Sequence, residues 1–307
     1  MGSSGFRSWA IVVISLLGIS TGPAAFGLSS IGIASEQLAR EFGWSRTAIS
    51  AAVSVMMLCT AACMPIAGKL IDTYGARRVL IPSVVILAAC TGLLGFVHSY
   101  WQFIALYAGM GTIAVGTNST AYMRVITSWF DHRRGLAIGI AGSGTGLGFA
   151  YVPLLSQALL DHGGWRMVYF GLAGVLLLVT LPLVLIGIRE AAAHDAPHDQ
   201  PDVQQGQSGD SMGAAMRKPD FWVLGSIFVV LAFVLYGLIP HLVPMLQDRG
   251  VSAADAAGIA SLFGMAAFAG RLLIGFMVDQ YDARRIAILF FSLSALGLAL
   301  LALPLPV

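Results

Sequence analysis

Stretches of about 20 predominantly apolar residues recur along the whole chain, and this feature limits its fold more than any other. Each stretch is long enough for a helix to cross a hydrocarbon core roughly 30 Å thick. Lipid offers no hydrogen-bond partner to backbone N–H and C=O groups, so each stretch must be a helix. We predict nine spans, at approximately Trp9–Ala34, Thr47–Ile71, Val79–Val97, Trp101–Ser128, Leu136–Leu160, Trp165–Ile188, Phe221–Leu246, Ala253–Val278 and Ile286–Leu303.

The composition agrees with an all-α membrane protein. Only 10% of the residues are charged, against about 25% in a soluble domain. The apolar run after Arg7 is longer than that of a signal peptide, and eight more follow, so we interpret it as the first span. No span carries the paired polar groups of an enzyme site. We therefore expect no enzyme activity, no metal or cofactor, and no nucleic-acid partner at a net charge of +2.

Between the sixth and seventh spans the sequence is rich in Asp, Gln, Gly, His and Pro, a composition that cannot bury a core. We predict three parts: a six-helix N-terminal bundle (1–188), a flexible cytoplasmic linker (189–219) and three helices of a partial C-terminal bundle (220–307). Ligand-like residues around His194 and His198 belong to this linker, and we interpret them as a solvated segment.

Lys and Arg are unevenly distributed between the two ends of the spans. With the N-terminus in the cytoplasm, the cytoplasmic side carries eleven and the opposite side four, which is the positive-inside bias. We therefore expect a multi-pass protein of the bacterial inner membrane, with its N-terminus and linker in the cytoplasm. The opposite side has Arg40, Arg46, Arg166 and Arg249.

An internal repeat relates two parts of the chain by an offset of 207 residues. The pattern after the second span recurs after the eighth, and Gly43 and Ser45 recur as Gly250 and Ser252. A constant offset on both sides of a helix indicates duplicated helical units, a common construction in transporters. The two copies of the loop pattern are Gly68, Asp72, Gly75, Arg77, Arg78 and Gly275, Asp279, Asp282, Arg284, Arg285.

The segment from Gly68 to Arg78 resembles the loop between helices two and three of the major facilitator superfamily, except that Thr73 stands where a basic residue is usual. The segment from Trp129 to Gly139 resembles the monocarboxylate porter and oxalate/formate antiporter branch. Gly164-Trp165-Arg166 and Gly270-Arg271 fit the same branch.

This resemblance implies a major facilitator fold, with twelve helices in two bundles around a central cavity. The sequence ends at Val307 after the ninth expected span, so it is expected either to be a truncated form or to need a partner. The resemblance also implies transport of a small organic anion, a mono- or dicarboxylate, by alternating access. Two alternatives remain open: a non-transporting membrane sensor or assembly subunit, and an efflux transporter of amphiphilic compounds.

Apart from residues within two positions of a span end, Arg124 and Arg271 are the two charged residues inside the expected spans. A charge at the membrane centre costs roughly 2.5–3.5 kcal/mol on insertion scales, so it needs a partner or a function. Neither has a carboxylate within a span, and a guanidinium can bind a substrate carboxylate through two hydrogen bonds. The resemblance places a substrate-binding arginine at Arg271. Arg124 lies near the cytoplasmic end of its span, where it can also extend to the interface.

Other polar residues in the spans are candidates for the substrate site. His241 lies between Pro240 and Pro244, which free backbone carbonyls one turn earlier, so it can carry a proton or bond to those carbonyls. The small residues from Gly139 to Gly148 lack the setting of a nucleotide loop and predict close helix packing. The remaining candidates, which helix packing also explains, are Tyr122, Asn118 and Tyr236.

Proton-coupled members of the branch have an acidic residue where Ala267 stands and a lysine near Gly27. Both differences argue against that coupling mechanism, while exchange, or proton symport through His241, remains open.

The loop motifs are expected to act as gates. We expect Asp279 to approach the start of the fifth span near Gly135, next to Arg133 and Arg134, when the outer side is open. Asp72 is expected to be left with Arg77, Arg78 or water.

Overall fold

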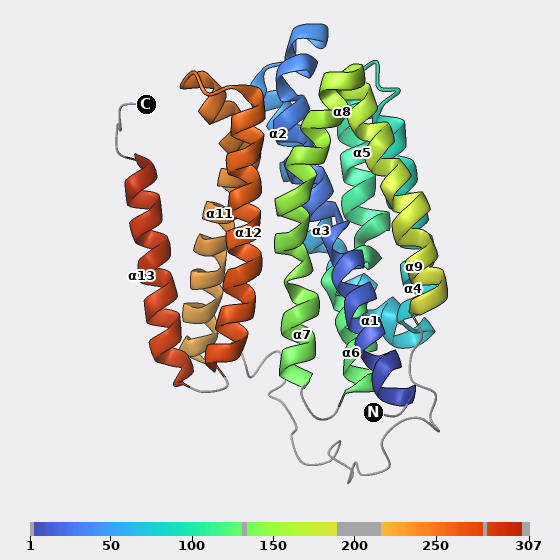
Figure 1. The fold of residues 1–307 in the computed structure, drawn as a ribbon, viewed down its shortest axis with the longest axis vertical. Coiled ribbons are helices and arrows are strands. Elements are labelled where there is room, and N and C mark those ends of the chain that lie inside the picture. The colour runs from blue at the N-terminus through green and yellow to red at the C-terminus, as the bar shows by residue number, and fades with distance from the viewer. Residues whose placement is uncertain (1–2, 131–133, 189–215, 279–280, 303–307) are drawn as a thin grey trace.

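The computed structural model describes residues 3–130, 134–188, 216–278 and 281–302. Within these residues the chain is helical, without a strand, and its long helices stand side by side (Figure 1). We call the end of this array where Ile188 and Met216 lie the linker end, and the opposite end the far end.

Three of the first four expected spans coincide with helices that are longer than expected or interrupted. The first is broken at Thr21 and Gly22, and the fourth contains a 3₁₀ segment before Asn118. The elements are α1 (Ser3–Ser20), α2 (Pro23–Phe42), α3 (Arg46–Tyr74), α4 (Ala76–Leu94), α5 (Tyr100–Thr112), η1 (Ile113–Thr117) and α6 (Ser119–Trp129).

The fifth and sixth expected spans form one long helical stretch with a sharp bend. Gly163 and Gly164 have non-helical dihedral angles, and Gly164 has a φ of 70°, so the chain reverses direction there. The stretch consists of α7 (Arg134–Gly142), α8 (Gly144–Val175), the π-helical η2 (Leu176–Thr180) and α9 (Leu181–Gly187).

The last three expected spans correspond to α11 (Pro219–Asp248), α12 (Ala253–Val278) and α13 (Ala283–Ala302). Helix α11 begins at Pro219, inside the segment predicted as linker, because proline suits the first position of a helix. The rest of that linker, residues 189–215, lies outside the described residues.

Among the described residues, six helical stretches are long and apolar enough to cross a membrane. Two of them, Arg7–Phe42 and Arg134–Gly187, have 36 and 54 residues. The second covers two expected spans, which accounts for part of the difference from nine. Length and composition therefore support several spans, but the number nine is not confirmed.

The internal repeat is visible in how two helices begin. Gly43 and Gly250 both have positive φ, at 69° and 88°. Two residues later, the Ser45 hydroxyl accepts the backbone N–H of Ala48, and the Ser252 hydroxyl accepts that of Asp255. Each serine thus satisfies one of the amides left unpaired at a helix start, which is why α3 and α12 begin at equivalent positions.

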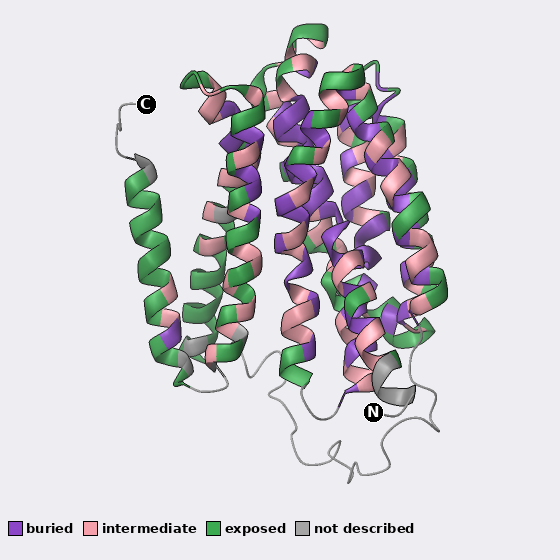
Figure 2. Cartoon of the chain, viewed as in Figure 1, coloured by how far each residue is buried: buried purple, intermediate pink, exposed green. Residues whose placement is uncertain are grey.

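The core lies mainly among α1 to α9, as the purple segments of Figure 2 show. One buried cluster, with Leu38, Phe103 and Trp165, lies toward the far end, and another, with Ile71 and Ile126, lies toward the linker end. Helix α12 packs most extensively on α8, and α11 on α2. Helix α13 is largely exposed and makes its main contact with α12.

Candidate functional site

Arg271 lies on α12 at its contact with α7 and α8. Its guanidinium donates a hydrogen bond from Nη1 to the carbonyl oxygen of Gly142. The side chain is exposed, and in the described part of the chain no carboxylate forms an ion pair with it. Most of the guanidinium donors are thus available to another acceptor.

The carbonyl of Gly142 is accessible because the helix is interrupted beside it. Helix α7 ends at Gly142, Ser143 is a turn residue, and α8 begins at Gly144. Carbonyls at a helix end lack an amide partner within the helix, and a guanidinium can supply one. The Gly-Ser-Gly sequence thus creates the acceptor that Arg271 uses.

The run of small residues at the start of α8 serves two contacts. A side chain on Gly144 or Gly148 would meet the backbone oxygens of Leu16 and Ser20. A side chain on Gly146 would meet the backbone of Phe268, and one on Gly264 would meet the backbone between Phe149 and Ala150. The predicted packing role of this run is confirmed, and it brings α12 into backbone contact with α8.

Arg124 has a carboxylate partner that lies one residue beyond the expected second span. Its Nη1 forms an ion pair with Oδ1 of Asp72. The expectation that Asp72 would be left with Arg77, Arg78 or water was wrong. The reason is that folding sets α6 beside the end of α3, although the two residues are 52 positions apart in sequence.

The other residues of the first loop motif hold helix ends together. Gly75, with a φ of 84°, ends α3 and leads directly into α4. Arg77 donates a hydrogen bond to the carbonyl oxygen of Leu185 at 2.7 Å, near the C-terminus of α9, where a cation suits the helix dipole. Arg78 is exposed, and a methyl group at Gly68 would meet no described atom of a neighbouring element within 4 Å.

The second loop motif lies partly outside the described residues. Asp282 accepts the backbone N–H groups of Arg284 and Arg285 at 2.9 and 3.2 Å and so caps α13. The side chains of both arginines are exposed, and Gly275 lies within α12. Asp279 and Arg133 are outside the described residues, so their expected pairing near Arg134 and Gly135 stays a prediction.

The polar candidates do not meet at one point. Tyr122 is fully buried against Gly18, and its hydroxyl has no partner among the described residues. Asn118 precedes α6 and donates to the carbonyl of Val115 at 3.1 Å. His241 is exposed on α11, and the side chain of Tyr236 lies outside the described residues. The observed environments of Tyr122 and Asn118 are those of helix packing.

An ion pair at the far end joins a helix that precedes the linker to a helix that follows it. Arg46, at the start of α3, binds both carboxylate oxygens of Asp248, at the end of α11, and the Nη2–Oδ1 distance is 2.9 Å. The 207-residue offset relates Asp248 to Glu41, another acidic residue at the far end of its helix. This relation could have marked Asp248 as a candidate from the sequence alone.

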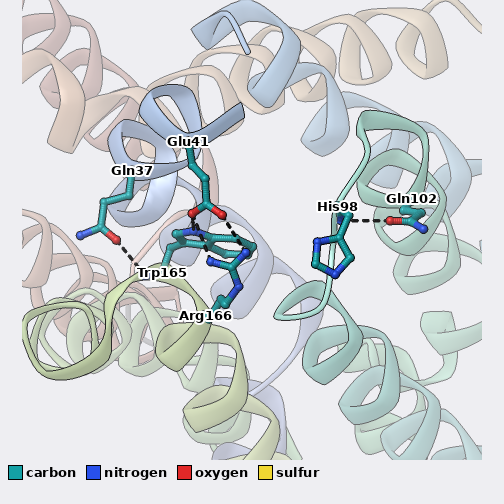
Figure 3. Close-up of polar contacts among 6 residues, drawn as sticks. All are labelled: Gln37, Glu41, His98, Gln102, Trp165 and Arg166. Atoms are coloured by element: carbon teal, nitrogen blue, oxygen red, sulfur yellow. Dashed lines mark hydrogen bonds and ion pairs between the residues drawn. The ribbon is translucent and has the colours of Figure 1, made fainter. Parts of the chain in front are cut away.

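Glu41 belongs to a second polar cluster at the far end (Figure 3). Its carboxylate accepts two hydrogen bonds from Arg166, at 2.7 and 3.1 Å, and one from the Trp165 indole at 2.6 Å. Gln37 accepts the Trp165 backbone N–H at 2.8 Å, and the Arg166 guanidinium stacks on the Trp165 ring at 4.3 Å. The cluster fastens the bend at Gly164 to the end of α2.

Comparison with known families agrees with this helical arrangement. The sequence profile of the Major Facilitator Superfamily matches residues 17–307. The chain belongs to the Major Facilitator Superfamily. Members of this superfamily are membrane transporters and not enzymes, so the chain is an integral multi-pass membrane protein of the transporter class.

Several curated superfamily members are similar to the chain. It is 30% identical to the MFS-type transporter YcxA of Bacillus subtilis, over 87% of the chain and 65% of the relative. It is 27% identical to the oxalate:formate antiporter of Oxalobacter formigenes, over 84% of the chain and 60% of the relative. It is 28% identical to human monocarboxylate transporter 11, over 88% of the chain and 57% of the relative. The chain thus spans about two thirds or less of these three relatives.

A solved structure of the superfamily shares the fold. A bacterial homologue of the human lysosomal transporter Spinster, in an inward-facing, unoccupied conformation, superposes with a TM-score of 0.69 at 23% identity. The match covers 92% of this chain and 64% of that one. The expected major facilitator fold and the resemblance to the monocarboxylate and oxalate/formate branch are confirmed.

Proposed function

We propose that the chain acts in secondary transport of a small organic anion, a mono- or dicarboxylate, by alternating access. The observation that carries this proposal is Arg271, an exposed cation within a membrane-spanning helix, without a carboxylate partner in the described part of the chain. An anionic cargo would supply the missing charge and accept two hydrogen bonds from the guanidinium. The names of two relatives, the oxalate:formate antiporter and monocarboxylate transporter 11, support the same class.

The charges favour a cargo with one carboxylate bound at Arg271. Asp72 already neutralises Arg124, so of the two arginines well inside the expected spans only Arg271 lacks a carboxylate among the described residues. A second carboxylate would have to remain in an apolar environment, which is costly. A bound cargo carboxylate would replace the Gly142 carbonyl as the acceptor for Arg271. When no cargo is bound, the guanidinium would donate to the Gly142 carbonyl again.

We also propose that the linker end faces the cytoplasm, because the excess of Lys and Arg lies there. The division into an N-terminal bundle, a linker and a partial C-terminal bundle is part of the same proposal.

Uptake of labelled carboxylates into proteoliposomes that contain the 307-residue chain tests this function. We expect Arg271→Lys to lower uptake of a monocarboxylate at least tenfold, because lysine keeps the charge but loses the two-pronged geometry. Arg249→Lys is the matched control, since Arg249 is exposed at the end of α11 and belongs to neither the site nor the loop motifs, and it should transport normally. Unchanged uptake by Arg271→Lys at equal protein would remove Arg271 from the site. Absence of carboxylate transport by the unaltered chain would favour the sensor or efflux alternatives.

A further inference from the structure

A small cavity lies on the far-end side of the seam between the helices before the linker and those after it. The centre of a water molecule can occupy about 20 Å³ of it, whereas roughly 10–15 Å³ is enough to hold one water. Ala260 on its wall is seven residues, about 10 Å, from the far-end start of α12. Its wall includes Ser29 and Gly32 of α2, Phe149 and Pro153 of α8, Ile239 of α11 and Ala260 of α12.

Ser29 presents a polar side chain to this cavity. It is 7% exposed, and its hydroxyl has no hydrogen-bond partner in the described part of the chain. The other serines of the same helix region behave differently: Ser30 donates to the carbonyl of Phe26, and Ser35 to that of Gly32. Ser29 is therefore the serine of this group that lines the cavity and has a hydroxyl without a partner in the described part of the chain.

Two prolines free backbone carbonyls of residues that line the cavity or adjoin its wall: Phe149 lines it, and Pro240 follows the lining residue Ile239. A proline lacks the N–H that would bond to the carbonyl four residues earlier. Pro153 therefore frees the carbonyl of Phe149, which lies against Gly264 of α12, and Pro244 frees that of Pro240. The Pro240 oxygen lies 3.1 Å from the Cβ position of Gly32, on the cavity wall.

We propose that one water molecule binds in this cavity and bridges α2, α8 and α11. It donates its two hydrogens to the carbonyls of Phe149 and Pro240 and accepts the hydroxyl hydrogen of Ser29. This gives the Ser29 hydroxyl and the two freed carbonyls partners, within the two to four bonds that a buried water makes. A metal cation fits less well, because Ca²⁺ and Mg²⁺ take about six oxygen ligands or more.

The water would belong to the closed state of the far end. Ser29 and Phe149 precede the linker and Pro240 follows it, so the bridge holds only while these helices are together. The same end is joined by the ion pair of Arg46 and Asp248. Loss of the bridge therefore favours opening of the far end, whatever cargo the protein carries.

Thiol accessibility measures this opening. The natural cysteines, Cys59, Cys63 and Cys90, are replaced by serine, and Val243→Cys on the cavity wall reports entry of a membrane-impermeant maleimide added from the far side. We expect Ser29→Ala to raise the labelling rate about fivefold, because the loss of one hydrogen bond should raise the population of the open state by about that factor. Ser30→Ala is the matched control and should leave the rate unchanged, because the Ser30 hydroxyl bonds within its own helix.

Gly32→Ala is an independent variant, because its new methyl group would press on the Pro240 oxygen and occupy part of the cavity. It should also raise labelling. Equal labelling of Ser29→Ala, Ser30→Ala and the parent protein would overturn the proposal. A labelling rate that depends on sodium in place of choline would also overturn it, since it would identify a cation as the ligand. In an experimental structure that shows other ordered waters, density within hydrogen-bond distance of Ser29 Oγ is expected, and its absence would refute the assignment.

Discussion

At the scale of single residues, the two arginines within the spans have different environments. Arg124 is paired with Asp72 and lies toward the linker end, with 40% of its side chain exposed. Arg271 has only the Gly142 carbonyl among the described residues. The first arrangement is that of an ion pair between helices, and the second leaves donors available for a ligand. The same residue type thus has two roles, decided by what lies opposite each guanidinium.

The pair of Asp72 and Arg124 should contribute little to stability on its own. Its side chains are 73% and 40% exposed, and exposed pairs are worth about 0.2–1 kcal/mol. We expect Asp72→Asn and Arg124→Gln each to lower the free energy of unfolding by up to about 1 kcal/mol, and the double variant to lose less than the sum. Thermal unfolding in detergent measures all four proteins. Strictly additive losses would show that the two side chains do not interact.

At the scale of elements, the seam between α8 and α12 depends on the absence of side chains. Gly146 and Gly264 lie at positions where even a methyl group would meet the backbone of the opposite helix. This closeness brings the Ser261 hydroxyl to the carbonyl of Ala150 and the Arg271 guanidinium to that of Gly142. The small residues therefore position the candidate anion site.

Gly264→Ala should disrupt this seam. Its methyl group would collide with backbone atoms, which cannot move aside as a flexible side chain can, so we expect a loss of about 1–3 kcal/mol. Gly258→Ala, in the same helix, has no atom within 4 Å of the new methyl group and should be neutral or stabilising by up to about 1 kcal/mol. Thermal unfolding distinguishes them. Equal melting temperatures for the two variants would contradict the close contact.

At the scale of the whole molecule, the helices before and after the linker are joined at the far end. A buried cluster there combines Ile33 of α2 with Leu242 and Val243 of α11 and Ala256 of α12. By contrast, residues 221–230 of α11, nearer the linker end, are exposed. The structure is therefore closed at the far end.

Charge exchange tests the role of the far-end ion pair in that closure. We expect Arg46→Asp to open the far end, because two carboxylates would then face each other, and Asp248→Arg to do the same through two guanidinium groups. The double exchange should restore closure. Distances between spin labels on the far-end tips of α3 and α11 report the result. A double variant as open as either single one would show that other contacts hold this end closed.

Much of the fold follows from the sequence alone, because span length and backbone pairing in lipid are local requirements. Among the described residues, each expected span lies mostly on helical residues, and the 207-residue repeat reappears in the matching caps at Ser45 and Ser252. The small-residue run predicted close packing, and the residue patterns indicated the superfamily. The interruption of the first span at Thr21 and Gly22 was missed, although Pro23, the first residue of α2, is a local signal for it.

Only the tertiary structure decided which side chains meet. The partners of Arg124 and Arg46 are 52 and 202 residues away in sequence, so no local pattern identifies them. The cavity at Ser29 likewise depends on residues of α2, α8, α11 and α12 that meet at one wall. Hydrophobic length determines that a segment crosses the membrane, whereas the depth and rotation of each helix against its neighbours determine whether a polar group finds a partner. That is why the sequence located the candidate residues and the packing assigned their partners.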